Sequence, residues 1–302
     1  MNGSPDPALS FIIDGHRIAA KPIKPALYVV ATPIGNLGDT TLRALHTLAA
    51  ADIVACEDTR VTAVLLRHFG IEARLLAYHD HNAERQRPKL IEALDQGKAV
   101  ALVSDAGTPL VSDPGYRLVT EVQAAGHSVV PIPGASAVMA ALVASGLPTD
   151  SFMFAGFLPP KSAARTKRLA TLAAVPATLV FFESAQRVAA TLADMSEALG
   201  VRDAVVAREL TKTFETIRRG TLAELSAAYA GEPTPKGEIV VLVSPPREEV
   251  TSAEDADKVL ASLLEEKSVS AAAAEAAAIT GLPRRELYQR ALALKEIRDG
   301  KR

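Results

Sequence analysis

Short apolar segments alternate with amphipathic segments along most of the chain, and this alternation constrains the fold more than any other feature. Each apolar segment leads into a loop of glycine, proline or polar residues, and most loops lead into a stretch with helical spacing. Such repeats predict βαβ units and a largely parallel sheet. The strands expected in the first half are LYVVAT (27–32), DIVACE (52–57), KAVALVSD (98–105) and HSVVPIPG (127–134).

A second set of strands begins near residue 150 and is arranged differently. DAVVAREL (203–210) and TFETIRRG (213–220) are adjacent along the chain, which indicates antiparallel pairing. We therefore expect two α/β domains, residues 26–136 with a mostly parallel sheet and residues 137–246 with a mixed sheet. The other strands expected here are FMFAGFL (152–158), ATLVFFES (177–184) and EIVVLVS (238–244).

Both ends of the chain depart from this pattern. Residues 1–25 are rich in proline and small polar residues, and we predict a flexible extension there. A shift to proline and acidic residues at 244–257 marks a domain boundary. Residues 250–302 then indicate a helix-turn-helix-like unit, whose last 23 residues hold seven Lys/Arg and three acidic residues. The alternative is a capping helical hairpin with a solvated basic end.

Composition narrows the class of protein. A formal net charge of −2 excludes a wholly basic nucleic-acid-binding protein but allows local basic faces. The single cysteine, Cys56, cannot form an intrachain disulfide, and its apolar neighbours predict a buried structural thiol. We expect no membrane span, because no apolar run reaches roughly 18 residues. The N-terminus lacks a secretory pattern, so we expect a cytoplasmic protein.

Four loops of the first half hold groups suited to ligand binding. ATPIGNLGDTTLRAL (31–45) offers GxxGD rather than GxGxxG, which argues against a nicotinamide cofactor. VSDAGTPLVSDPG (103–115) joins a strand to a helix, where open α/β sheets bind ligands. Its glycines permit close backbone approach, and its Asp105 can accept hydrogen bonds. PIPGASAVMAALVASG (131–146) begins a helix whose free N–H groups can cradle a polar group.

The fourth of these loops, CEDTR (56–60), follows an apolar strand. Its Glu57 and Asp58, with Arg60, suit substrate positioning or acid–base work; alternatively, Asp58 or Thr59 only caps the next helix. The segment LLAYHDHNAERQR (75–87) contains His79, but the chain has no second His/Cys cluster at ligand spacing. We therefore expect no metal and interpret this segment as a substrate-facing loop.

Three loops of the second half, FFESAQR (181–187), ARELTKTFE (207–215) and PKGEIV (235–240), repeat the combination of a strand end and charged residues. Together with the loops of the first half, they predict a ligand held in a cleft between two domains.

Taken in order, ATPIGNLGD, ACEDTR, SDAGTPLVSDPG, PGASA, FFES, ARELTKTFE and KGE resemble the motifs of the tetrapyrrole-methylase superfamily, and within it of the ribosomal RNA small subunit methyltransferase I family. The resemblance covers about residues 27–244, and the C-terminal segment resembles that family's helix-turn-helix appendage. It implies a homodimeric two-domain α/β enzyme that binds S-adenosylmethionine. The implied reaction methylates the ribose 2′-hydroxyl of a cytidine in the decoding region of 16S rRNA in the 30S subunit.

The resemblance also implies site residues. Those expected to bind the cofactor are Pro33, Gly35, Asp105, Ala106, Gly107, Thr108, Ser136, Ala137, Phe181, Glu183, Lys236 and Gly237. From their own chemistry and their place at strand ends, and not from the resemblance, we expect Glu57, Asp58 and Arg60, with His79 second, to face the acceptor. Family members commonly have Pro and His where this chain has Ala185 and Gln186, so we assign no catalytic role to that segment.

RNA binding at this net charge requires local basic patches, for which Arg85, Arg87 and Lys89, residues 161–168 and the C-terminal end are candidates. Two other functions stay open. One is a methylase of a small tetrapyrrole precursor, which would need neither basic loops nor a helix-turn-helix. The other is a catalytically silent RNA-binding factor of ribosome assembly.

Overall fold

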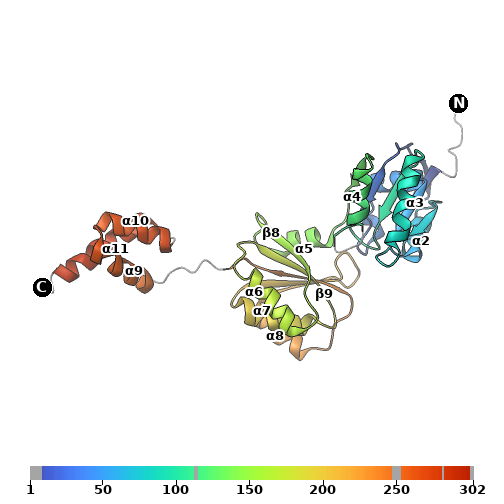
Figure 1. Cartoon of the computed structure of the whole chain (residues 1–302). Helices are drawn as coiled ribbons and strands as arrows, with labels where there is room; N and C mark the ends of the chain where they lie inside the picture. Colours follow the sequence, from blue (N-terminus) through green and yellow to red (C-terminus); the bar gives the residue numbers. More distant parts are fainter. Residues whose placement is uncertain (1–8, 112–114, 247–252, 281, 300–302) are drawn as a thin grey trace. The chain divides into compact units, whose positions relative to one another are not determined.

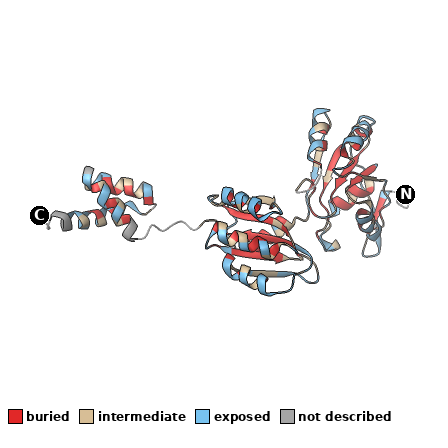
Figure 2. Cartoon of the chain, turned by 60° about the horizontal axis from the view of Figure 1, so that its bottom comes forward, coloured by how far each residue is buried: buried red, intermediate tan, exposed pale blue. Residues whose placement is uncertain are grey.

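The computed structural model describes residues 9–111, 115–246, 253–280 and 282–299. The chain forms two compact units, which divide after Pro246 (Figure 1). In the first unit the buried residues lie along the sheet strands and on the inner faces of the helices, and in the second unit they lie on the helix faces that pack together (Figure 2). Every helix in the described part of the chain is too short or too polar to cross a membrane.

The first sheet is parallel throughout, as the alternating pattern predicts, with the strand order β5-β4-β6-β3-β7. Alternate strand residues face opposite sides, so α1 and α2 pack on one face, and α3 and α4 pack on the other. The strands are β3 (Leu27–Val30), β4 (Ile53–Cys56), β5 (Leu75–Ala77), β6 (Val100–Val103) and β7 (Val129–Ile132). The helices are α1 (Leu42–Ala50), α2 (Thr59–His68), α3 (Ala83–Asp95) and α4 (Tyr116–Ala124).

The second sheet is mixed, as predicted, with the strand order β11-β10-β12-β9-β8. Only the β8–β9 pair is parallel, and β10 pairs antiparallel with both β11 and β12. Three helices cover one face of this sheet, and α5 covers the other. The strands are β8 (Phe152–Phe157), β9 (Thr178–Ser184), β10 (Asp203–Arg208), β11 (Thr216–Thr221) and β12 (Glu238–Val243). The helices are α5 (Ala137–Ser145), α6 (Ser162–Leu172), α7 (Val188–Leu199) and α8 (Leu222–Gly231).

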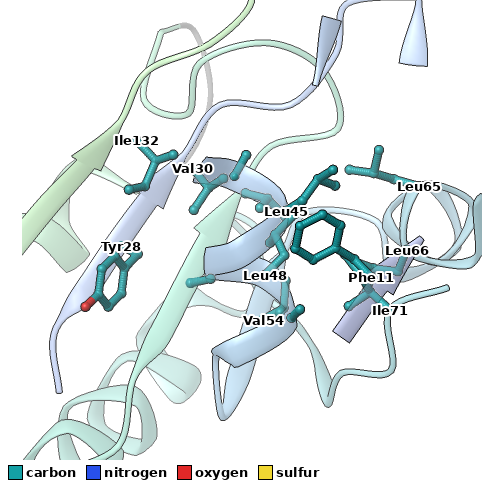
Figure 3. Close-up of a cluster of buried hydrophobic side chains, with 14 of the residues drawn as sticks. Phe11, Tyr28, Val30, Leu45, Leu48, Val54, Leu65, Leu66, Ile71 and Ile132 are labelled. Atoms are coloured by element: carbon teal, nitrogen blue, oxygen red, sulfur yellow. The ribbon is translucent and has the colours of Figure 1, made fainter. Parts of the chain in front are cut away.

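A β-hairpin occupies part of the predicted N-terminal extension. Its strands, β1 (Ser10–Ile13) and β2 (His16–Ala19), pair antiparallel, and the Ile12 N–H donates to the Phe69 carbonyl at 2.7 Å. Phe11 is fully buried in the cluster that also contains Leu45 and Leu48 (Figure 3). The prediction of a flexible extension is therefore wrong for residues 10–19, while residues 1–8 lie outside the described part of the chain.

The C-terminal unit is a small helical domain with a core of its own, as predicted. It contains α9 (Ala253–Glu266), α10 (Val269–Thr280) and α11 (Arg284–Asp299), so one helix precedes the predicted pair. Leu260, Ala273 and Leu287, one from each helix, are fully buried in this core.

Candidate functional site

A cavity of about 570 Å³ lies where loops from both sheets meet, and its size is within the range of roughly 300–1,000 Å³ typical of ligand pockets. Its walls come from the loops after β3 and β6, the start of α5, the ends of β9 and β10, and the start of β12 with the residues just before it. Nine of the twelve residues predicted to bind a cofactor line it: Asp105, Ala106, Gly107, Thr108, Ser136, Ala137, Glu183, Lys236 and Gly237.

The loop after β6 is fixed to its neighbours by backbone contacts. Thr32 and Gly107 exchange two backbone hydrogen bonds of 2.8 and 3.1 Å, and the Thr108 hydroxyl donates to the Ala135 carbonyl at 3.2 Å. Gly107 has φ +82°, and an added Cβ there would lie 3.2 Å from Ile34. Glycine is required at this turn because an L side chain would be strained and crowded. The last part of this loop, SDPG (112–115), is predicted to start the next helix; Gly115 directly precedes α4, and residues 112–114 lie outside the described part of the chain.

The start of α5 offers backbone donors to the same cavity. The Ser136 hydroxyl caps the helix by accepting from the Met139 N–H at 3.4 Å. Ser136 and Ala137 both line the cavity. The first turn of a helix carries N–H groups without intrahelical partners and a partial positive charge, which suits a carboxylate or another anionic group.

Strand β9 presents different residues to its two faces, and this corrects one predicted contact. Phe181 is fully buried in the core cluster that includes α7, whereas Phe182 lines the cavity. Phe182 is braced by Phe154 and Phe157, whose ring centroids lie 4.8 and 5.6 Å away. Successive side chains of a strand alternate between its two faces. The prediction that Phe181 contacts the cofactor is therefore wrong by one residue, since Phe182 is the one that faces the cavity.

Glu183 lines the cavity, but its carboxylate is engaged within the protein. It accepts hydrogen bonds from the Ser184 N–H at 2.7 Å, the Thr191 hydroxyl at 2.6 Å and the Arg187 guanidinium at 3.1 Å. Its side chain is 1 % exposed. The geometry therefore favours a structural role that fixes the end of β9 against α7.

A second cavity, of about 350 Å³, adjoins the first. The two share Ile34, Asp105, Ala106 and Glu238 as wall residues. Pro33 and Gly35, predicted to contact a cofactor, line this second cavity instead of the first. The remaining wall residues are Thr32, Leu37, Val61, Thr62, Val64, Leu65, Ser104 and Lys212.

Comparison with known proteins identifies the family. The model described as Tetrapyrrole (Corrin/Porphyrin) Methylases matches residues 26–226, and the model described as RsmI C-terminal HTH domain matches residues 250–295. A relative from Mesorhizobium japonicum named Ribosomal RNA small subunit methyltransferase I is 61 % identical over 281 residues, which cover 93 % of this chain and 96 % of the relative. A relative of the same name from Vibrio cholerae is 50 % identical, with coverage of 88 % and 93 %. This chain belongs to the ribosomal RNA small subunit methyltransferase I family.

Solved structures of tetrapyrrole methylases share the fold of this family member. A cobalt precorrin-4 methyltransferase aligns with a TM-score of 0.57 at 20 % identity, over 73 % of this chain and 95 % of that one. Uroporphyrin-III C-methyl transferase from Thermus thermophilus, solved in complex with S-adenosyl homocysteine, aligns with a TM-score of 0.52 at 20 % identity, over 72 % and 96 %. At these identities the similarity concerns the fold alone.

Glu57 and Asp58 are the acidic pair that we predicted to face the methyl acceptor. They lie at the start of α2. Asp58 caps the helix by accepting from the Arg60 N–H at 2.8 Å, and its own N–H donates to Asp105 Oδ1 at 2.9 Å. Hydrogen bonds from the side chain and the backbone of Arg60 hold the pKa of Asp58 at about 2. A carboxylate with so low a pKa is a weak base. This low basicity and the capping hydrogen bond both favour the capping alternative for Asp58. Glu57 lines neither cavity.

Arg60 and His79 have different surroundings. The Arg60 side chain is 89 % exposed beside Val61 and Thr62, which line the second cavity, so it can reach a phosphate at the rim. His79 lines neither cavity. Its backbone N–H donates to Asn82 Oδ1 at 3.0 Å, and its Nε2 lies 3.1 Å from Asn82 Nδ2. These contacts shape the loop between β5 and α3.

Proposed function

We propose that this protein transfers a methyl group from S-adenosylmethionine to the ribose 2′-hydroxyl of a cytidine in the decoding region of 16S rRNA, within the 30S subunit and in the cytoplasm. The observation that carries the proposal is the pair of adjoining cavities, which offers separate places for a methyl donor and an acceptor. The names of the relatives and the matched C-terminal domain support an rRNA acceptor over a small tetrapyrrole.

The first cavity fits S-adenosylmethionine in its chemistry. Ile34, Phe182 and Leu210 give it apolar walls suited to an adenine ring. Asp105 can accept hydrogen bonds from hydroxyl or ammonium groups, and the start of α5 can hold a carboxylate. An added Cβ at Gly237 would overlap the Glu209 side chain, so the glycine permits a close approach here. When bound, the cofactor supplies an electrophilic methyl group on a sulfonium.

The protein's own contribution is alignment. Ile34, Asp105, Ala106 and Glu238 form the boundary between the cavities, so a nucleophile in the second cavity can face a methyl group held in the first. Near-attack alignment alone can lower a barrier by several kcal/mol. Arg60 at the rim would hold an RNA phosphate while the ribose enters.

A homodimer is part of the proposal. Met139 and Val143, one helical turn apart on α5, are 47 % and 74 % exposed and form an apolar strip suited to a second copy of the chain. Val143→Asp should convert the dimer to a monomer in light scattering. A wild-type protein that is monomeric at micromolar concentration would contradict this arrangement.

The decisive experiment uses purified protein, methyl-labelled S-adenosylmethionine and 30S subunits that lack the modification. Digestion of the rRNA and mass spectrometry should locate one 2′-O-methylcytidine in the decoding region. A methyl on a base, or on another ribose, would overturn the stated specificity. Cofactor binding with no transfer to any subunit preparation would identify a catalytically silent assembly factor.

A further inference from the structure

Lys212 and two glutamates form a charged cluster where the two cavities meet. The Lys212 ammonium donates to Glu209 Oε1 and to Glu238 Oε2, each at 2.8 Å. The Glu238 N–H also donates to Glu209 Oε1, at 3.0 Å. Burial lowers the pKa of Lys212, but the hydrogen bonds with Glu209 and Glu238 outweigh it and raise the pKa overall. Lys212 is therefore a cation at neutral pH and holds Glu238 in one position.

The backbone around this cluster is strained. Glu209 and Thr211 have φ of +53° and +66°, and they are two of the four non-glycine residues with positive φ in the described part of the chain. An added Cβ at Gly35 would overlap the Lys212 side chain, so the loop after β3 closes directly onto this lysine. Strain of this kind persists where the surrounding structure fixes it, and it concentrates at functional sites.

Glu238 and Asp105 are the two carboxylates that line both cavities; Asp105 is half-buried and accepts the Asp58 N–H through Oδ1 at 2.9 Å, whereas Glu238 is exposed. Glu183 is engaged by α7, and Asp58 is paired with Arg60. The Glu238 side chain is 71 % exposed and contributes to the walls of both cavities. No hydrogen bond within the described residues uses its Oε1. Glu238 therefore presents an available acceptor oxygen at the boundary between the two cavities.

The second cavity suits an uncharged nucleoside. Val61, Val64 and Leu65 of α2 form an apolar wall against which a base can pack. Its ionisable wall residues are two carboxylates, Asp105 and Glu238, and one ammonium, Lys212, which gives a formal net charge of −1. A net negative charge repels a phosphate group inside the cavity, but it does not repel an uncharged ribose hydroxyl.

We propose that the acceptor nucleoside occupies the second cavity and that Glu238 is the catalytic base, with Lys212 as its positioning residue. This inference rests on the proposed function. The bond between the 2′-oxygen and the methyl carbon forms as the sulfur–methyl bond breaks. The sulfur keeps the electron pair of the broken bond and becomes a neutral thioether. The hydroxyl proton passes to the Glu238 carboxylate and from there to water.

The test of the base compares Glu238→Gln with Glu232→Gln in the full chain. Glu232, like Glu238, pairs with a basic residue, in its case Arg218 at 2.7 Å, but it lines neither cavity. Glu238→Gln should lower kcat on 30S subunits at least about 100-fold, in the range typical of a lost general base. Its thermal midpoint and its affinity for S-adenosylhomocysteine should stay at the wild-type values, and Glu232→Gln should keep wild-type kcat.

The outcomes separate this inference from the function on which it rests. Wild-type kcat in Glu238→Gln, beside an active wild-type enzyme, would overturn Glu238 as the base and leave the proposed function standing. A wild-type enzyme that methylates no subunit would overturn the proposed function, and the inference with it.

Two further variants test the positioning residue and the acceptor cavity. Lys212→Met should lower kcat with little change in KM, and Lys212→Arg should restore much of it. If Lys212→Met instead lowers the thermal midpoint and cofactor affinity together, and Lys212→Arg restores neither, the lysine is only structural. Val64→Trp should fill the second cavity and raise KM for the subunit without changing S-adenosylhomocysteine affinity. An unchanged KM would place the acceptor elsewhere.

Discussion

Phe181 and Phe182 are adjacent and chemically identical, yet they face different surroundings. The first packs in the core with α7, and the second lines the cavity. The sequence FFES contains no signal that separates the two faces, because a strand buried on both sides is apolar at every position. The sequence could therefore predict that the end of β9 contributes to a site, but not which phenylalanine does so.

This difference gives a matched pair of variants. Phe182→Ala should weaken S-adenosylhomocysteine binding and leave most of the free energy of unfolding intact, because its ring faces the cavity. Phe181→Ala should lower the free energy of unfolding by about 3–5 kcal/mol, as is typical for a deleted core aromatic ring. Isothermal titration and urea denaturation measure the two effects. Weaker binding in properly folded Phe181→Ala, with none in Phe182→Ala, would reverse the assignment.

Arg60 offers a second prediction for a single residue. Arg60→Ala should weaken 30S binding and reduce its salt slope by about one, as expected for one lost phosphate contact. Arg67→Ala, at the other end of α2, is the control. The pKa of Asp58 is held at about 2, so the Asp58 carboxylate stays ionised well below the usual aspartate pKa. The ion pair between Asp58 and Arg60 is therefore complete above that usual pKa, and it is lost only as the pH falls toward 2. The effect of Arg60→Ala should thus be constant between about pH 5 and 9, and an unchanged salt slope would contradict the phosphate contact.

The sequence does contain a turn signal for the N-terminal hairpin, but the proline-rich composition of residues 1–25 outweighed it in the prediction. Asp14 and Gly15 lie between the alternating residues of β1 and β2, and Asp-Gly is a strong signal for a type I′ turn. Both residues have positive φ, +49° and +78°, as that turn requires. The nearby prolines favoured the interpretation as a flexible extension. Strand β5 was missed for another reason, since three residues are too few to show a period.

The hairpin is expected to stabilise the first sheet domain. Phe11→Ala should lower the free energy of unfolding by about 3–5 kcal/mol, because its fully buried ring packs against α1 and α2. Ile18→Ala, in the exposed strand β2, should have a much smaller effect. Chemical denaturation of both variants provides the comparison. Equal, small effects would show that the hairpin adds little to stability.

At the scale of the whole molecule, strand pairing places residues in one site that are far apart in the sequence. Lys212 and Glu238 are separated by 26 positions and meet because β10 and β12 are neighbours in the second sheet. The alternating pattern predicts a parallel first sheet and a mixed second sheet, but it does not give the strand order. Sequence reasoning could therefore identify the loops that form the first cavity, while the cluster between the cavities required the structure.

The division of the chain into two units gives the last prediction. All residues that line the cavities belong to the first unit, and the C-terminal unit has a core of its own. Helix α11 presents Arg284, Arg285 and Lys295 as exposed cations, with Tyr288 41 % exposed among them, and this combination suits RNA backbone contact and base stacking. Deletion of residues 250–302 should therefore weaken binding to 30S subunits and leave S-adenosylhomocysteine affinity and the thermal midpoint of the first unit unchanged.

Sedimentation with 30S subunits at two salt concentrations and isothermal titration with S-adenosylhomocysteine measure these affinities. The double substitution Arg284→Ala and Arg285→Ala is the milder companion to the deletion, and it should reduce subunit binding and its salt slope without removing the domain. Equal loss of subunit and cofactor binding on deletion would show that the appendage supports the α/β unit instead of contacting RNA. Preserved subunit binding in both proteins would assign RNA recognition to the basic residues of the first unit.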